Sequence, residues 1–126
     1  MDKWIQLQSS NGEDNLFPKE RKELLWTNSS PSSSFASQTA QFDMTDYDVG
    51  ICLFGYDTSG NPRCEVYFSK NGTYICNMYN TNTSRVFRTF SASSSGVTFD
   101  GGNSAGGSNN GAAIPLAIYG IKMEVS

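Results

Sequence analysis

The chain has 126 residues, of which 37% are hydrophobic and 17% charged, with a formal net charge of −3 and no histidine. This length predicts one domain with a core of its own, and the negative charge argues against nucleic acid, which requires a basic face. No apolar run is long enough to cross a bilayer, and the N-terminus shows no signal peptide. We therefore expect synthesis in the cytoplasm, without export through the Sec pathway and without membrane insertion.

The first part of the chain has the character of an extended arm. Residues 4–7 have the pattern of a short strand, and a hydrophobic segment at 16–18 precedes the charged run 19–23. We expect that run to be a solvated connector, with a short helical turn as the alternative. The division that follows is an N-terminal arm and connector at 1–22 and a β-sandwich domain at 23–126.

The remainder of the chain alternates strand patterns with turn residues and shows no convincing helix. Strand 49–56 is apolar on both faces, which is typical of a central strand, and Asn71-Gly72 predicts a tight turn that makes 49–80 a three-stranded meander. Residues 100–111 are rich in Gly, Asn and Ser and predict an exposed flexible loop. The expected strands are 24–27, 37–43, 49–56, 63–69, 73–79, 85–91, 97–99 and a C-terminal strand within 112–126.

These features predict an all-β fold of about eight short strands, an antiparallel β-sandwich or a jelly-roll-like arrangement, preceded by the extended arm. In the C-terminal strand, Ile121 and the alternate residues after it predict a core face, and a bulge at Gly120 would switch the phase of the pleat. Before Gly120 both faces are apolar. We expect one of them, formed by Pro115, Ala117 and Tyr119, to lie against a second subunit.

Little in the sequence indicates catalysis. Without histidine the commonest general base is missing, and serine or cysteine triads that need it are excluded. Asp43, Asp46 and Asp48 invite a calcium interpretation, but their spacing does not match an EF-hand loop, and aspartate is common in turns. With Asp57 and Glu65 they are also candidates for a two-carboxylate hydrolase, although most of the five lie in expected turns. We expect no enzyme activity, no catalytic residue, no metal and no cofactor.

The three cysteines, Cys52, Cys64 and Cys76, fall in expected strands and lack metal-site spacing, so we expect reduced thiols that pack as small apolar side chains. Aromatic residues make up 13% of the chain. Most should pack in the core, but Tyr56, Tyr67 and Tyr79 are candidates for surface contacts with a glycan. Tyr67 shares its strand face with polar residues and is the one expected to point outward.

Both ends of the chain contain segments of a recognisable kind. Residues 7–18, Leu-Gln-Ser-Ser-Asn-Gly-Glu-Asp-Asn-Leu-Phe-Pro, resemble a segment of phage tail and fibre proteins. Residues 23–28, 31–39 and 46–48 resemble the opening of small structural domains from phages and prophages of Gram-positive bacteria. Residues 114–122, Ile-Pro-Leu-Ala-Ile-Tyr-Gly-Ile-Lys, resemble the ending of these domains, whereas the middle of the chain, 57–108, resembles nothing we recognise.

The resemblance implies a virion structural protein, a tail or head fibre or a receptor-binding tip. Such domains are β-rich, often trimeric, and can contact the host surface. The expected partners are further copies of the chain in a homotrimer, other virion proteins and a host cell-surface polysaccharide. The alternative hypothesis is a carbohydrate-binding module without a virion role.

Overall fold

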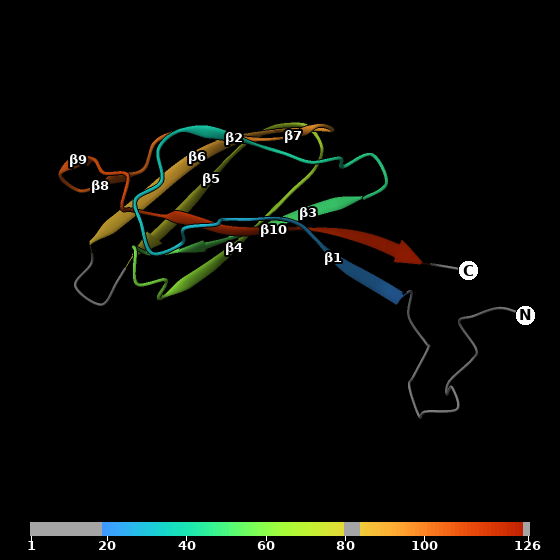
Figure 1. The fold of residues 1–126 in the computed structure, drawn as a ribbon, viewed down its shortest axis with the longest axis horizontal. Helices are drawn as coiled ribbons and strands as arrows, with labels where there is room; N and C mark the ends of the chain where they lie inside the picture. The colour runs from blue at the N-terminus through green and yellow to red at the C-terminus, as the bar shows by residue number, and fades with distance from the viewer. Residues whose placement is uncertain (1–18, 80–83, 125–126) are drawn as a thin grey trace, which may run out of the picture.

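The computed structural model describes residues 19–79 and 84–124, and within these ranges it contains strands and no helix. In this part of the chain, ten strands form two antiparallel sheets that pack face to face (Figure 1). The predicted all-β class and the β-sandwich architecture are therefore confirmed. The strand expected at 4–7 and the motif at 7–18 lie outside the described residues.

The first sheet has the order β1-β10-β3-β4. These strands are β1 (Lys19–Thr27), β10 (Ile114–Glu124), β3 (Val49–Gly55) and β4 (Arg63–Phe68). The C-terminal strand β10 is internal, between β1 and the apolar strand β3. The prediction of a solvated connector at 19–23 is wrong, because these residues pair with β10 in a ladder from Lys19 opposite Glu124 to Glu23 opposite Gly120.

The second sheet has the order β2-β7-β6-β8-β9, with β5 paired to the other edge of β6. Its strands are β2 (Gln38–Gln41), β5 (Gly72–Tyr79), β6 (Arg85–Ser93), β7 (Gly96–Phe99), β8 (Asn103–Ser104) and β9 (Gly107–Ser108). The segment expected as a flexible loop thus contains a two-stranded hairpin, and Ser104 of β8 pairs with Val86 of β6.

The expected three-stranded meander is wrong. The β3–β4 hairpin is present, but β5 leaves that sheet and pairs along its whole length with β6. The chain crosses from one sheet to the other between β4 and β5, and the hydroxyl of Tyr74 bonds to this connection. It donates to the Asn71 carbonyl at 2.8 Å and accepts from the Ser69 backbone N–H at 3.1 Å. Asn71-Gly72 therefore connects a strand of one sheet to a strand of the other. The meander was wrongly predicted because an Asn-Gly turn specifies the local backbone shape and not the strand with which the next segment pairs.

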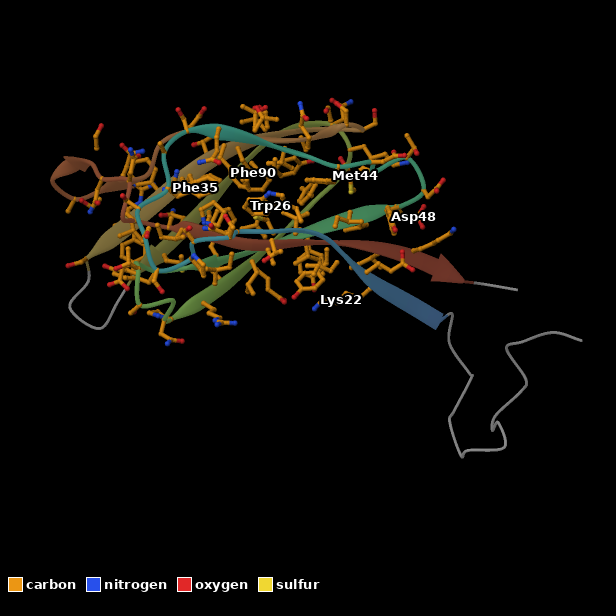
Figure 2. All side chains as sticks on the ribbon, in the orientation of Figure 1. Lys22, Trp26, Phe35, Met44, Asp48 and Phe90 are labelled. Carbon is orange, nitrogen blue, oxygen red and sulfur yellow. The ribbon has the colours of Figure 1, made fainter. Side chains whose placement is uncertain are left out.

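The core is an aromatic layer between the sheets. Phe90 lies at its centre, with ring centroids 5.8 Å from Phe54, 5.6 Å from Phe68 and 5.8 Å from Phe99. Figure 2 shows Trp26, Phe35, Met44 and Phe90 between the two layers. Such aromatic pairs add about 0.5–1.5 kcal/mol each to the effect of burial, so this layer holds the two sheets in one arrangement.

The inner face of β6 also carries a charge. Arg88 is fully buried, beside Cys76 across the β5–β6 ladder. Burial lowers the pKa of Arg88 to about 10, against the effects of Cys76 and Asp100, so the guanidinium remains charged at neutral pH. The three cysteines are free: Cys52 and Cys76 are buried and Cys64 is half-buried. Burial raises the pKa of both the Cys52 and the Cys76 thiols.

Candidate functional site

The C-terminal strand changes phase four residues before the expected position. The register with β3 shifts between Pro115 and Ala117, so Pro115 lies opposite Phe54 and Ala117 opposite Leu53. Phe54 belongs to the core, whereas Leu53 is half-buried outside it. The bulge expected at Gly120 lies instead in the Pro115–Ala117 interval.

This shift decides which side chains of β10 point outward. Pro115 is fully buried, and a Cβ on Gly120 would meet the rings and methyl groups of Tyr47 and Leu25, which pack against the core. Because side chains alternate along a strand, Tyr119 and Ala117 then face away from the core. The structure therefore separates Pro115 from the other two residues of the predicted subunit interface.

A row of apolar side chains crosses the outer face of the β1-β10-β3-β4 sheet. Leu24 lies opposite Tyr119, Tyr119 opposite Ile51, and Ile51 opposite Tyr67, so every strand contributes one member. Leu24 is 57% exposed and Tyr67 59% exposed, whereas Ile51 between them is only 3% exposed. We call Leu24, Tyr119, Ile51 and Tyr67 the apolar row.

A lysine and a glutamate lie over the apolar row. The ammonium of Lys22 is 4.5 Å from the centre of the Tyr119 ring and 3.9 Å from a carboxylate oxygen of Glu65. Figure 2 shows Lys22 on the outer side of its sheet, away from Trp26 and Phe90. Since both charged side chains remain substantially exposed, an ion pair of this kind contributes about 0–1 kcal/mol. The Lys22–Glu65 ion pair therefore covers Tyr119 only weakly, and a partner surface can displace it.

Sequence reasoning singled out two of the four members of the apolar row, Tyr119 and Tyr67, but did not place them on one surface. Tyr119 is half-buried and Ala117 is 8% exposed within the single chain, and their contact with another subunit stays a prediction. Leu24 and Ile51 were not singled out. Leu24 stands beside the apolar pair Leu25-Trp26, which marks it as part of a strand. Its outward orientation could not be predicted from alternation, because the register of β1 with β10 shifts between Leu24 and Trp26.

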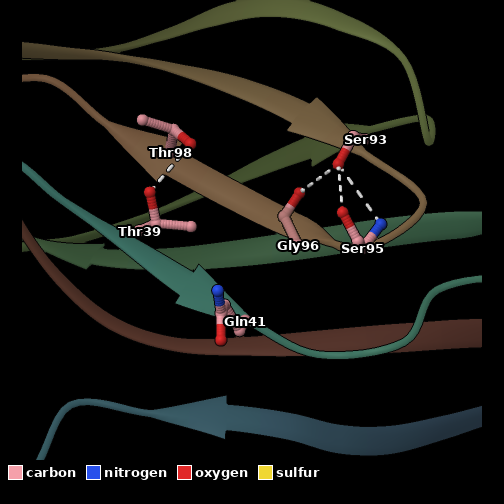
Figure 3. A pocket seen from close by; sticks show the side chains of 6 residues that line it. All are labelled: Thr39, Gln41, Ser93, Ser95, Gly96 and Thr98. Carbon is pink, nitrogen blue, oxygen red and sulfur yellow. Dashed lines mark hydrogen bonds between the residues drawn. The ribbon is translucent and has the colours of Figure 1, made fainter.

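The outer face of the second sheet has different chemistry. At one end, six residues line a shallow hollow of about 320 Å³ (Figure 3). The Thr39 and Thr98 hydroxyls are 3.1 Å apart, and the Ser93 hydroxyl is 3.1 Å from that of Ser95. The lining residues are Thr39, Gln41, Ser93, Ser95, Gly96 and Thr98, which are polar and uncharged apart from the glycine.

The other end of the same face carries aromatic rings and a cation. Arg85 donates from Nε to the Asn77 side-chain oxygen at 2.7 Å, and its guanidinium lies 4.1 Å from the centre of the Phe87 ring. Tyr79, directly across the ladder from Arg85, is 58% exposed. Ile75 is also exposed here.

The three candidate glycan tyrosines do not form one site. Tyr56 is buried, and its hydroxyl donates to the Ser84 carbonyl at 2.9 Å, so its ring offers no open face for stacking. Tyr67 points outward, as expected, from β4 in the first sheet. Tyr79 points outward from β5 in the second sheet, so Tyr67 and Tyr79 lie on opposite sides of the sandwich.

Two of the candidate carboxylates have local structural partners. Asp43 accepts from the Thr45 backbone N–H at 2.9 Å and from its hydroxyl at 2.7 Å, and these bonds lower the pKa of Asp43. Asp57 makes the same pair of contacts with Ser59. Within ranges 19–79 and 84–124, no group of three or more acidic or cysteine side chains is arranged to hold a metal ion. The same ranges contain no helix of the length and apolarity needed to span a membrane.

These features define a class: an antiparallel β-sandwich with an apolar row on one outer face and a hydroxyl, amide and aromatic surface on the other. Compared with protein-family models, curated proteins and solved structures, the chain gives no match. The two outer faces are therefore the basis for functional reasoning.

Proposed function

We propose that the chain is a structural domain of a phage virion, in a tail or head fibre or a receptor-binding tip, and that it works as a homo-oligomer. The virion context is supported by the sequence resemblance at both ends of the chain. Assembly is supported by one observation of the fold, the apolar row on the outer face of the first sheet. We propose a trimer as the assembled state, with other virion proteins and a host cell-surface polysaccharide as further partners.

The apolar row supports assembly because an outward sheet face in a sandwich is normally polar. Leu24 and Tyr67 each keep more than half of their surface in water, although they flank Ile51, which is already covered. Fully burying such a side chain contributes about 1.5–3 kcal/mol. Because Leu24 and Tyr67 are 57% and 59% exposed, a second copy that covers both would gain roughly half of that contribution at each position.

The charges beside the apolar row suit a copy of the same chain. Lys22 and Glu65 have opposite sign and lie on one face, so an approaching copy can meet each with the other. Matching of this kind favours a correct encounter and its register more than it adds affinity. A partner of strongly acidic or basic character would leave one of the two charges facing its own sign.

Light scattering with size-exclusion chromatography tests the assembly. We expect the wild-type chain to be oligomeric at micromolar concentration and Tyr67→Glu to dissociate it, since the row would then carry a charge. Tyr79→Glu is the matched control, because Tyr79 has nearly the same exposure, 58% against 59%, on the opposite sheet. A monomeric wild-type chain, or equal dissociation by both variants, would contradict the proposed interface.

The virion context needs its own experiment. Particles induced from the strain that encodes the chain should be labelled at a tail or head fibre by an antibody raised against it. Label confined to the cytoplasm of the host would contradict a virion role. The alternative function, a carbohydrate-binding module without a virion role, is favoured by the aromatic and hydroxyl surface of the second sheet.

A further inference from the structure

We propose that the outer face of the β5-β6-β7-β2 sheet binds a sugar chain, with aromatic residues at one end and hydroxyl groups at the other. This inference concerns the sheet opposite the apolar row and does not depend on the assembly proposed above. It places the glycan contact on a surface of which only Tyr79 was expected from sequence.

The hydroxyl end is a row of four residues on neighbouring strands. Thr73 lies opposite Ser91, Ser91 opposite Thr98, and Thr98 opposite Thr39. The hydroxyls of Thr73 and Ser91 are 3.3 Å apart, and those of Thr98 and Thr39 are 3.1 Å apart. With strands about 4.8 Å apart, the row spans about 14 Å. Because each hydroxyl both donates and accepts, paired hydroxyls keep capacity for a ligand that carries hydroxyls of its own.

The hollow adjoins this row. Thr39 and Thr98 belong to both, and the hollow extends along β7 and β6 to Ser95 and Ser93 (Figure 3). Its volume of about 320 Å³ is at the lower end of the range of about 300–1,000 Å³ for small-ligand sites. A lining of hydroxyl and amide groups suits a single sugar unit better than an apolar side chain.

The aromatic end supplies a stacking surface. Tyr79 exposes its ring, whereas Phe87, two ladder positions along on the neighbouring strand, has its ring covered by the Arg85 guanidinium. The C–H face of a sugar ring packs on aromatic rings, while the polar edge of the sugar takes hydrogen bonds. Asn77 already holds the Arg85 side chain at 2.7 Å, so the guanidinium loses little freedom when a ligand binds.

The charge of the face narrows the class of ligand. The outward side chains of β5, β6, β7 and β2 that the structure describes include Arg85 and no carboxylate, although the whole chain has a net charge of −3. One cation is too few for a nucleic acid, which needs several phosphate contacts. Because the described part of this face has no carboxylate, a sugar chain with anionic substituents meets no charge repulsion there. A neutral sugar chain can bind without stripping water from a charged carboxylate.

Isothermal titration of the wild-type chain with six hexasaccharide-length probes tests this face: cellohexaose, mannohexaose, chitohexaose, xylohexaose, maltohexaose and the galacturonate hexamer. We expect at least one probe to bind. Tyr79→Ala should then weaken binding about tenfold through loss of the stacking ring. Thr98→Val, which keeps the shape of the side chain and removes the hydroxyl, should weaken it about fivefold.

Two controls make the test specific. Thr98→Ser should retain binding, and Tyr67→Ala, on the opposite sheet, should leave the affinity of each site for the hexasaccharide unchanged even where it dissociates the oligomer. Unchanged unfolding midpoints would show that the variants fold. The proposal is overturned if no probe binds at millimolar concentration, or if Tyr67→Ala weakens binding as much as Tyr79→Ala does. Either result would leave the assembly proposal standing.

Discussion

The Nε of Arg88 donates a hydrogen bond to the carbonyl oxygen of Ala113, 2.8 Å away, inside the sandwich. The same guanidinium donates to the carbonyls of Asp100 at 2.7 Å and Ala112 at 3.0 Å. Ala113 has a positive φ of 48°, which a residue with a Cβ rarely adopts. One buried side chain therefore ties both ends of segment 100–113 to β6 and holds Ala113, the residue that immediately precedes β10.

Replacement of Arg88 by methionine should destabilise the fold strongly. The variant leaves buried carbonyl groups without donors, and we expect the free energy of unfolding to fall by about 3–5 kcal/mol. Urea unfolding followed by tryptophan fluorescence measures this change. Arg85→Met, on the outer face of the same strand, is the control and should change the value by less than about 1 kcal/mol. Equal effects of the two substitutions would contradict the structural role of Arg88.

Gly50 tolerates no side chain. A Cβ at this position of β3 would overlap the ring of Phe68, which is buried in the core. Gly50→Ala should therefore lower the free energy of unfolding by about 1–3 kcal/mol, as overpacked cores do. Gly106→Ala is the matched control, because a Cβ there meets nothing within 4 Å. Thermal unfolding of both variants checks the prediction, and an unchanged midpoint for Gly50→Ala would refute it.

Phe90 should be the most sensitive aromatic residue of β6. Its ring contacts Phe54, Phe68, Tyr74 and Phe99, and it is fully buried. Phe90→Ala should lower the free energy of unfolding by about 3–5 kcal/mol, through lost burial and the cavity left behind. Phe87→Ala, on the half-buried outer face, provides the comparison in the same urea titration. A smaller loss for Phe90→Ala than for Phe87→Ala would show that the sheet faces are wrongly assigned.

Alkaline pH should weaken the fold through its buried thiols. Burial raises the pKa of Cys52 well above its ordinary 9.0 and raises that of Cys76 as well. Above about pH 8.5 the unfolded chain then loses thiol protons that the folded chain keeps, so the free energy of unfolding falls as the pH rises. Below that pH both thiols are protonated in the folded and the unfolded chain, and their contribution to the free energy of unfolding does not change with pH.

Urea midpoints at neutral pH and near pH 10 measure this dependence. The double variant Cys52→Ala/Cys76→Ala should show a smaller fall between the two conditions than the wild-type chain, although its stability at neutral pH will be lower. An identical slope in the double variant would mean that other groups cause the alkaline loss.

The sequence by itself determined the features that depend on local order. Val86, Arg88 and Phe90 alternate with Phe87 and Thr89, and β6 buries the first set and leaves the second half-buried. The strand at β3 follows from its continuous apolar run, and its hairpin to β4 follows from the turn residues between the two strands. Such signals are local because a pleated strand exposes alternate residues whatever its partner.

Only the tertiary structure decided how the strands meet. The Asn71-Gly72 turn gave no sign that β5 would pair with β6 in the other sheet, and the charged run that starts at Lys19 became a strand because β10 lies beside it. The bulge between Pro115 and Ala117 set which residues of β10 face outward. Pairing and register depend on contacts far apart in the chain, and a shift of one residue exchanges the two faces of a strand. The same long-range packing buried Tyr56 and left Tyr67 and Tyr79 on opposite outer faces.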